Sequence, residues 1–128
     1  MHNGTILITE DKDEFRTIYG DRLRFDHYDV LDAKNGVEAL EILKNKKVDL
    51  IITDINMPEK DGYQLLAEVK ADEKLKDIPV IVMTVFDEGE HVKKALELGA
   101  ADYLVKGNHT PNDVAAKIAA ILKSKSAV

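Results

Sequence analysis

The chain is 128 residues long, a length typical of one domain, and it lacks cysteine, which excludes disulfide bonds, thiolate metal sites and cysteine nucleophiles. Its 24 acidic and 18 basic residues give a net charge of −6, which argues against direct binding of nucleic acid, because that needs a basic surface. No apolar run approaches the ~20 residues that cross a bilayer and no secretory signal is visible, so we expect a cytoplasmic protein without a membrane segment.

Five short runs, apolar and rich in β-branched residues, are typical of β-strands. Four of them are almost continuously apolar, as in a parallel sheet that is covered on both faces. The second run is interrupted by Asp29 and Asp32, which indicates an edge strand. In chain order the predicted strands are Thr5–Thr9, Tyr28–Ala33, Val48–Thr53, Pro79–Met83 and Ala101–Val105.

A helix is predicted after each strand, because each following segment opens with a short polar residue and has an acid or amide three positions later. Pro111 suits the first position of the fifth helix, and Gly99 suits the end of the fourth. Gly20 costs the first helix about 1 kcal/mol, so we expect that helix to be short or bent. The capping pairs are Asp11/Glu14, Asn35/Glu38, Asp61/Gln64, Asp87/Glu90 and Thr110/Asp113. Apolar stripes at helical spacing are Phe15, Ile18 and Tyr19, then Val92, Ala95 and Leu96, then Val114, Ile118, Ile121 and Leu122.

The alternation of strand and helix predicts an α/β fold, a doubly wound parallel sheet of five strands flanked by five helices. No linker, repeat or low-complexity segment divides the chain, so we expect residues 1–128 to form one domain. In an open sheet of this kind the functional crevice lies beyond the carboxyl ends of the strands. The residues expected to meet there are Glu10, Asp11, Asp54, Thr84 and Lys106.

Three carboxylates that lie close together repel one another unless a cation intervenes. A hard divalent ion meets that need, and Mg²⁺ is the natural candidate because it binds carboxylates, water and phosphate oxygens. Lys106 offers a point charge for a phosphate oxygen and Thr84 offers a hydroxyl for a second one. A carboxylate beside a metal can act as a nucleophile and form an aspartyl phosphate, and Asp54, central in the sheet, is the best candidate.

At these residues the chain resembles a known family, the receiver domain of two-component response regulators, including the single-domain chemotaxis type. The resemblance covers essentially the whole chain, and it implies the flavodoxin-like strand order 2-1-3-4-5. The matching pieces are the acidic pair Glu10-Asp11, the segment Ile51–Pro58 with Asp61-Gly62 after it, Val82–Thr84, and Ala101–Lys106.

The resemblance implies a phosphoprotein that receives a phosphoryl group on Asp54 from a histidine kinase, a phosphotransfer protein or a small phosphodonor. Asp11, Asp54 and the backbone carbonyl of Asn56 would bind Mg²⁺ directly, and Glu10 would help through water. Lys106 and Thr84 would hold phosphoryl oxygens. Thr84 and Tyr103 would then switch the surface of the fourth helix, fifth strand and fifth helix, where a downstream protein binds. Such a domain is not an enzyme beyond catalysing its own phosphorylation and dephosphorylation.

The chain departs from the family pattern at two positions. Gly107 follows Lys106 where the family usually has proline with a cis bond, and a cis bond is costly without proline, so we expect a trans or mobile lysine loop. Phe86, two residues after Thr84, lies where the family varies and where dephosphorylation is tuned, and its bulk could hinder an attacking water.

Some residues also have a purely structural interpretation. Asp11 could be no more than the N-cap of the first helix, and Tyr103 could simply pack against its neighbours. The four histidines show no ligand spacing and are expected on the surface.

Two other functions compete with the phosphorylation switch. A degenerate receiver would only bind partners, and Gly107 is the residue that favours this hypothesis. A phosphohydrolase of the haloacid dehalogenase type would need a carboxylate two residues after its nucleophile, where this chain has Asn56, which cannot transfer the proton. A flavodoxin-like electron carrier is disfavoured because no phosphate loop rich in glycine, serine and threonine follows the first strand.

Overall fold

The computed structural model of the chain describes residues 3–85 and 89–126, and the elements alternate as strand and helix along this length. The strands are β1 (Gly4–Thr9), β2 (Tyr28–Ala33), β3 (Leu50–Thr53), β4 (Val80–Thr84) and β5 (Asp102–Val105). The helices are α1 (Asp13–Phe25), α2 (Gly36–Asn45), α3 (Gly62–Ala71), α4 (Gly89–Glu97) and α5 (Pro111–Ser126).

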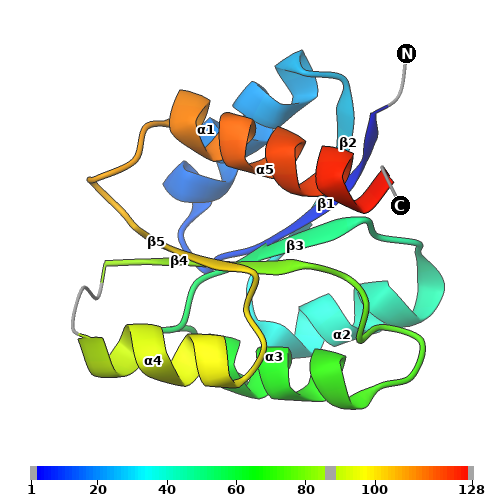
Figure 1. Cartoon of the computed structure of the whole chain (residues 1–128), viewed down its shortest axis with the longest axis vertical. Helices are drawn as coiled ribbons and strands as arrows, with labels where there is room; N and C mark the ends of the chain where they lie inside the picture. Colours follow the sequence, from blue (N-terminus) through cyan, green and yellow to red (C-terminus); the bar gives the residue numbers. More distant parts are fainter. Residues whose placement is uncertain (1–2, 86–88, 127–128) are drawn as a thin grey trace.

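The strands form one parallel sheet in the order β2-β1-β3-β4-β5, which confirms the predicted doubly wound architecture. Helices α1 and α5 cover one face of the sheet, and α2, α3 and α4 cover the other (Figure 1). Strand β2 lies at an edge, as Asp29 and Asp32 predicted. Because all strands run in one direction, their carboxyl ends meet at the same edge of the sheet.

Alternating strand residues divide the interior into two apolar layers. Ile6 and Ile8 of β1 pack with the layer that contains Tyr19 and Leu23 of α1, whereas Leu7 packs with the layer under α2 and α3. Side chains of a strand alternate between the two faces of a sheet, so both faces of β1 are buried. This burial on both sides explains why the strand runs are almost continuously apolar.

Two helix starts follow the predicted capping pairs closely. Asp61 and Gln64 form a full capping box at α3, in which each side chain accepts a backbone N–H of the other residue. Thr110 and Asp113 bond reciprocally in the same way before α5, and Pro111 is the first residue of that helix. At α2, the Asn35 side chain accepts the N–H of Glu38. Asp87 lies outside the described residues.

Two predictions for the first helix are contradicted, namely the N-cap Asp11 and a short length. Its N-cap is Lys12, in extended backbone and without a side-chain cap, because the carboxylate of Asp11 lies instead beside Glu10 and Asp54. The helix is not short: it runs for 13 residues through a buried Gly20, since tertiary packing outweighs the propensity cost.

Smaller corrections concern the strand bounds and two apolar stripes. Strands β1, β4 and β5 begin at Gly4, Val80 and Asp102 rather than at Thr5, Pro79 and Ala101, and β4 ends at Thr84 rather than at Met83. Strand β3 begins at Leu50 rather than Val48; just before it, the Asp49 side chain accepts the N–H of Thr5 at 2.8 Å. Ile18 and Leu96 were predicted on buried stripes, yet their exposed fractions are 51% and 50%. The stripe of α5 is confirmed, with Val114 and Ile118 buried and Ile121 and Leu122 packed against them.

Two further observations complete the fold. Within the described part of the chain, no helix combines the length and apolar character needed to cross a membrane. Of the histidines, His27 is exposed as expected, but His91 and His109 are half-buried, and His2 lies outside the described residues.

Candidate functional site

The three predicted carboxylates come together at the carboxyl ends of β1 and β3. Thr9 and Thr53 are paired in the parallel ladder, so the residues that follow them, Glu10 and Asp54, leave adjacent strands side by side. One ligand oxygen from each of Glu10, Asp11 and Asp54 lies within 4.8 Å of the others. Glu10 and Asp54 are buried, with exposed fractions of 4% and 7%, whereas Asp11 faces solvent.

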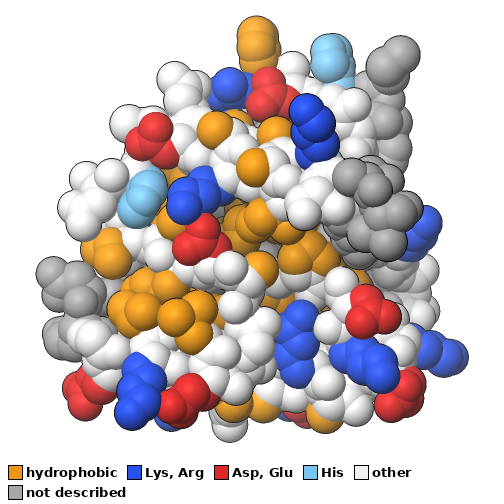
Figure 2. All heavy atoms as spheres, viewed as in Figure 1, with side chains coloured by type: hydrophobic (Ala, Val, Ile, Leu, Met, Phe, Trp, Pro, Cys, Tyr) orange, Lys and Arg blue, Asp and Glu red, His pale blue; other side chains and the backbone are white. Residues whose placement is uncertain are grey.

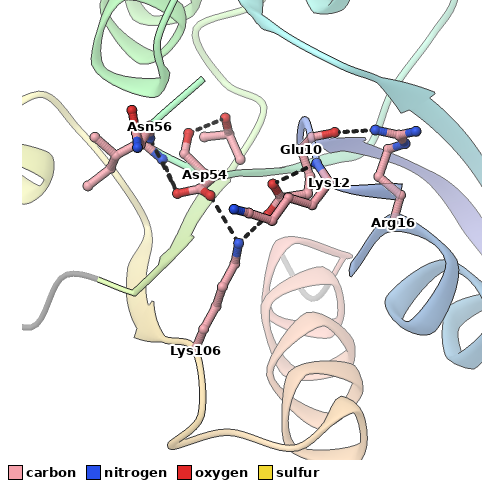
Figure 3. Close-up of polar contacts among 8 residues, drawn as sticks. Glu10, Lys12, Arg16, Asp54, Asn56 and Lys106 are labelled. Atoms are coloured by element: carbon pink, nitrogen blue, oxygen red, sulfur yellow. Dashed lines mark hydrogen bonds and ion pairs between the residues drawn. The ribbon is translucent and has the colours of Figure 1, made fainter. Parts of the chain in front are cut away.

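Lys106 extends from the end of β5 into this acidic cluster (Figure 3). Its ammonium points between two carboxylates: it forms an ion pair with Glu10 Oε1 and lies 3.0 Å from Asp54 Oδ2. The side chain is only 6% exposed, so these charges interact with little screening by water. The ammonium therefore neutralises part of the charge of the cluster.

Backbone geometry holds the carboxylate of Asp54 in place. Its Oδ1 accepts the N–H groups of Ile55 at 2.7 Å and Asn56 at 3.4 Å, while Oδ2 faces Lys106 (Figure 3). The chain then folds back so closely that a Cβ added to Gly62 would lie 2.1 Å from the backbone oxygen of Asp54. Glycine is thus required at the start of α3, because any side chain would displace the loop that carries Asp54.

The electrostatics of the cluster depend on burial and on the excess of carboxylates. The pKa of Glu10 is raised from 4.5 to about 7: burial is the largest cause, Lys106 opposes it, and a hydrogen bond with Asp11 and the charge of Asp54 add to it. Burial on its own would lower the pKa of Lys106, but the hydrogen bonds and charges of Glu10 and Asp54 outweigh that effect and raise it. Lys106 is therefore charged at neutral pH, and Glu10 is poised to gain or lose a proton.

Thr84 and Tyr103 lie beside the cluster on the same face of the sheet. Thr84 is fully buried, and its hydroxyl has no hydrogen-bond partner within residues 3–85 and 89–126. Tyr103 is half-buried and packs against the apolar layer on the side of α2, α3 and α4. A buried hydroxyl without a partner is costly, so the described residues alone leave the hydrogen-bonding capacity of Thr84 unused.

The lysine loop takes a defined path despite the replacement of proline by Gly107. All peptide bonds of the described residues are trans. Gly107 has φ of +92°, a conformation that glycine adopts without strain. The N–H of Lys106 donates to the backbone oxygen of Thr84 at 2.7 Å, which ties the end of β5 to the end of β4. This hydrogen bond helps to place Lys106 within reach of Asp54, although no proline follows the lysine.

Two residues near the cluster were not anticipated as part of the site. Arg16 of α1 donates to the backbone oxygen of Glu10 (Figure 3). It also pairs with Asp13, and the two contacts fix the turn between β1 and α1. Phe15 places its ring 4.1 Å from the Lys106 ammonium, measured to the ring centroid. The apolar stripe of α1 marked Phe15 only as a core residue, and no spacing rule links it to a lysine 91 positions later.

The donor set suits a hard divalent cation. Three carboxylates offer oxygen ligands, two of them are buried, and one is exposed to water that could complete a coordination shell. Mg²⁺ prefers such a site, with one or two carboxylates and several waters.

Comparisons with known proteins agree with this arrangement. Residues 6–119 match the family model of the response regulator receiver domain. The chain is 38% identical over 123 residues to a chemotaxis protein CheY homolog of Campylobacter jejuni, covering 94% of both chains. It is 39% identical over 118 residues to a probable transcriptional regulator, ycf27, of Cyanidium caldarium, covering 92% of this chain but 46% of that protein. The chain thus spans about half the length of some curated relatives and nearly all of others.

Solved structures show the same fold. The receiver domain of a signal transduction histidine kinase from Syntrophus aciditrophicus is 34% identical, with a TM-score of 0.87 over 94% of this chain and 91% of that one. A second neighbour, the Mn²⁺-bound form of the response regulator Rcp1, is 29% identical with a TM-score of 0.77 over 81% of each chain.

Proposed function

This chain belongs to the response regulator receiver domain family, and we propose that it works as a phosphorylation switch in which Asp54 accepts the phosphoryl group. The observation that carries the proposal is the convergence of Glu10, Asp11, Asp54 and Lys106 at one edge of the sheet. This arrangement provides a nucleophile, a cation site and an ammonium for a phosphoryl oxygen within one cluster.

The transfer itself asks for one bond to form and one to break. A carboxylate oxygen of Asp54 attacks the phosphorus, and the bond from phosphorus to the imidazole nitrogen of a phosphohistidine, or to the carboxylate oxygen of an acyl phosphate, breaks. The leaving group departs with the electron pair of that bond. The carboxylate needs no proton removed before it attacks, so the residues around it have to supply position and charge neutralisation rather than a general base.

The roles we assign to the remaining residues follow from their positions. Asp11, Asp54 and the Asn56 carbonyl would bind Mg²⁺, with Glu10 acting through water; the ion would neutralise charge on the phosphoryl oxygens. Lys106 already lies 3.0 Å from Asp54 Oδ2 and needs little movement to contact a phosphoryl oxygen. The hydroxyl of Thr84 is buried and has no hydrogen-bond partner among the described residues, and a phosphoryl oxygen would supply one.

We place the output of the switch on the surface formed by α4, β5 and α5. Figure 2 shows this face, with hydrophobic side chains gathered across β5 and α4. Leu96 of α4 is half exposed, and Tyr103 of β5, a strand that α4 contacts, is half-buried, so a movement of Thr84 and Tyr103 would change this surface. A protein partner of partly apolar character fits such a face.

We further propose that the domain takes its phosphoryl group from a histidine kinase or a phosphotransfer protein in the cytoplasm. The net charge of −6 favours protein partners over direct contact with nucleic acid. Two of the relatives, ycf27 and PhoB of Pseudomonas aeruginosa, are named as transcriptional regulators, and this chain spans about half the length of each. Any such output of a longer protein would arise outside this domain.

The deciding experiment measures the intact mass after incubation with Mg²⁺ and acetyl phosphate. We expect the gain of one phosphoryl group, lost in Asp54→Ala and in a metal-free control. Because Lys106 reaches Asp54 in spite of Gly107, we expect the chemistry to be intact. Failure to gain the group, together with failure to bind beryllofluoride, would leave the binding-only receiver as the better account.

A further inference from the structure

The ammonium of Lys106 is enclosed on three sides. Two sides face carboxylates, through the ion pair with Glu10 and the 3.0 Å contact with Asp54 Oδ2. The third side faces the ring of Phe15, whose centroid is 4.1 Å from Nζ. An ammonium has three N–H donors, and an aromatic face attracts a cation through its quadrupole, so each donor direction meets an attractive group.

The ring of Phe15 is itself held in place. It stacks on Tyr19, one turn further along α1, with centroids 6.3 Å apart and planes inclined by 15°. Tyr19 is buried in the apolar layer under α1 and α5. The two rings, with Ile8, Ile52 and Met83, line a small cavity that Glu10, Asp54 and Lys106 also border. Lys106 therefore lies against an apolar and aromatic wall.

We infer that Phe15 is a positioning residue for Lys106: its ring face holds the ammonium over Glu10 and Asp54 and keeps water from the third N–H. Lysine has a flexible four-carbon stem and a strongly hydrated ammonium, so it needs such a wall to stay in one place. The inference extends the proposed function, since it concerns how the lysine expected to bind a phosphoryl oxygen is kept ready. The ring contact does not depend on the carboxylates, so it would persist when a phosphoryl oxygen replaces one of them.

Graded fluorination of the ring separates this role from plain packing. Phenylalanine analogues with one, two and three fluorine atoms, placed at position 15 of the full chain, weaken the attraction of the ring face stepwise with little change of shape. The first readout is the exchange rate of the Lys106 ammonium protons with water, observed by NMR of ¹⁵N-lysine protein in the cold, at a single pH at which Glu10 is ionised and pairs with Lys106. We expect this rate to rise with each fluorine, by roughly three- to thirtyfold at the end of the series.

The second readout is the affinity for beryllofluoride in the presence of Mg²⁺, which we expect to weaken in the same order. Phe25 supplies a matched control, because its ring also contacts a cation, Arg22 at 5.5 Å, but it is 77% exposed and lies at the far end of α1. Fluorination there should leave Lys106 unchanged. Phe15→Tyr should keep slow exchange, whereas Phe15→Leu, which retains apolar volume without an aromatic face, should lose it.

The outcomes distinguish the two claims. A flat fluorination series, with Phe15→Leu equal to the unmodified protein, would overturn the positioning role of Phe15. A flat series with fast exchange only in Phe15→Leu would also overturn it, because it would show that the flat shape of the ring and not the charge distribution of its face matters. Failure of the unmodified protein to bind beryllofluoride while the exchange series still rises would remove the phosphoacceptor function and leave the Lys106 contact established.

Discussion

The buried carboxyl of Glu10 leads to a quantitative prediction: the affinity of the acidic cluster for Mg²⁺ rises between about pH 6 and pH 8. Burial, aided by Asp11 and Asp54 and opposed by Lys106, raises the pKa of this carboxyl to about 7. Below that pH the group is mostly protonated, and a protonated carboxyl neither attracts a cation nor offers it a full set of lone pairs. Mg²⁺ binding should therefore release a proton from Glu10.

The size of the effect follows from the same pKa. For a site that binds Mg²⁺ only when Glu10 is ionised, the apparent Kd is multiplied by one plus the ratio of protonated to ionised carboxyl. With a pKa of about 7 that factor is roughly 11 at pH 6 and roughly 1.1 at pH 8, so the affinity changes by about tenfold. If Glu10 contacts Mg²⁺ through a water molecule, the change in affinity is smaller, but the affinity still rises with pH.

Isothermal titration calorimetry with Mg²⁺ at pH 6, 7 and 8 measures this affinity. Repeating the titrations in buffers of different ionisation enthalpy counts the protons released. Glu10→Gln is the matched control, since it keeps the shape of the side chain and removes its titration; its affinity should be lower at pH 8 and nearly independent of pH. A tenfold change that persists in Glu10→Gln, or a flat affinity in the unmodified protein, would refute the role of Glu10.

The same pKa has a consequence for stability without metal. The folded-state pKa of Glu10 lies above its ordinary value of 4.5, so the folded state binds the proton more tightly than the unfolded state. The favourable contribution of protonated Glu10 is present below about pH 4.5 and is lost as the pH rises to about 7, by at most ~3 kcal/mol. The difference in unfolding free energy between the unmodified protein and Glu10→Gln, measured against pH by urea titration, should show this loss, and Mg²⁺ should reverse it.

Three further predictions test single residues. Thr84→Val replaces a buried hydroxyl, which has no partner among the described residues, by a methyl of similar shape, so the unphosphorylated protein should gain about 1 kcal/mol in urea unfolding while its affinity for beryllofluoride falls; a loss of stability would show that the hydroxyl already has a partner. Gly107→Ala should lower the stability by about 1–2 kcal/mol through its φ of +92° alone, because an added Cβ meets no atom within 4 Å; an unchanged Tm would contradict this. Tyr63→Phe removes the contact of the hydroxyl with His91 Nδ1 at 2.5 Å and should speed amide hydrogen exchange in α4 by a few-fold, with no change in α5.

Much of the fold could be predicted from the sequence because burial on both sides of a parallel sheet leaves a strong pattern. The strands around Ile6 and Ile51 are apolar on both faces, and Asp29 and Asp32 in the second apolar run indicate an edge strand. The predicted start of β3 was less accurate, because there a side chain and not a backbone oxygen accepts a hydrogen bond from the neighbouring strand. The carboxylate of Asp49 accepts the N–H of Thr5, and no apolar pattern records such a substitution.

The candidate site could be predicted in outline for a similar reason. Parallel strands bring the residues that follow them to one edge of the sheet, so Glu10 and Asp54 are neighbours after adjacent strands, and Lys106, after β5, reaches them with its long side chain. The pairing within the cluster could not be foreseen. Which carboxylates contact Lys106 depends on the direction of each side chain, and Glu10 and Lys106 are 96 positions apart.

Apolar periodicity shows which side of a helix is apolar, not whether another element covers that side. The stripe of α4 predicted that Leu96 is buried, yet α4 lies over the end of the sheet formed by β4 and β5, and among its described residues Ala95 alone is buried. A helix with so small a buried face can move at little cost in packing. The half-exposed Leu96 therefore supports placing the output of the switch at α4, because the same residue that misled the sequence prediction offers apolar surface to a partner.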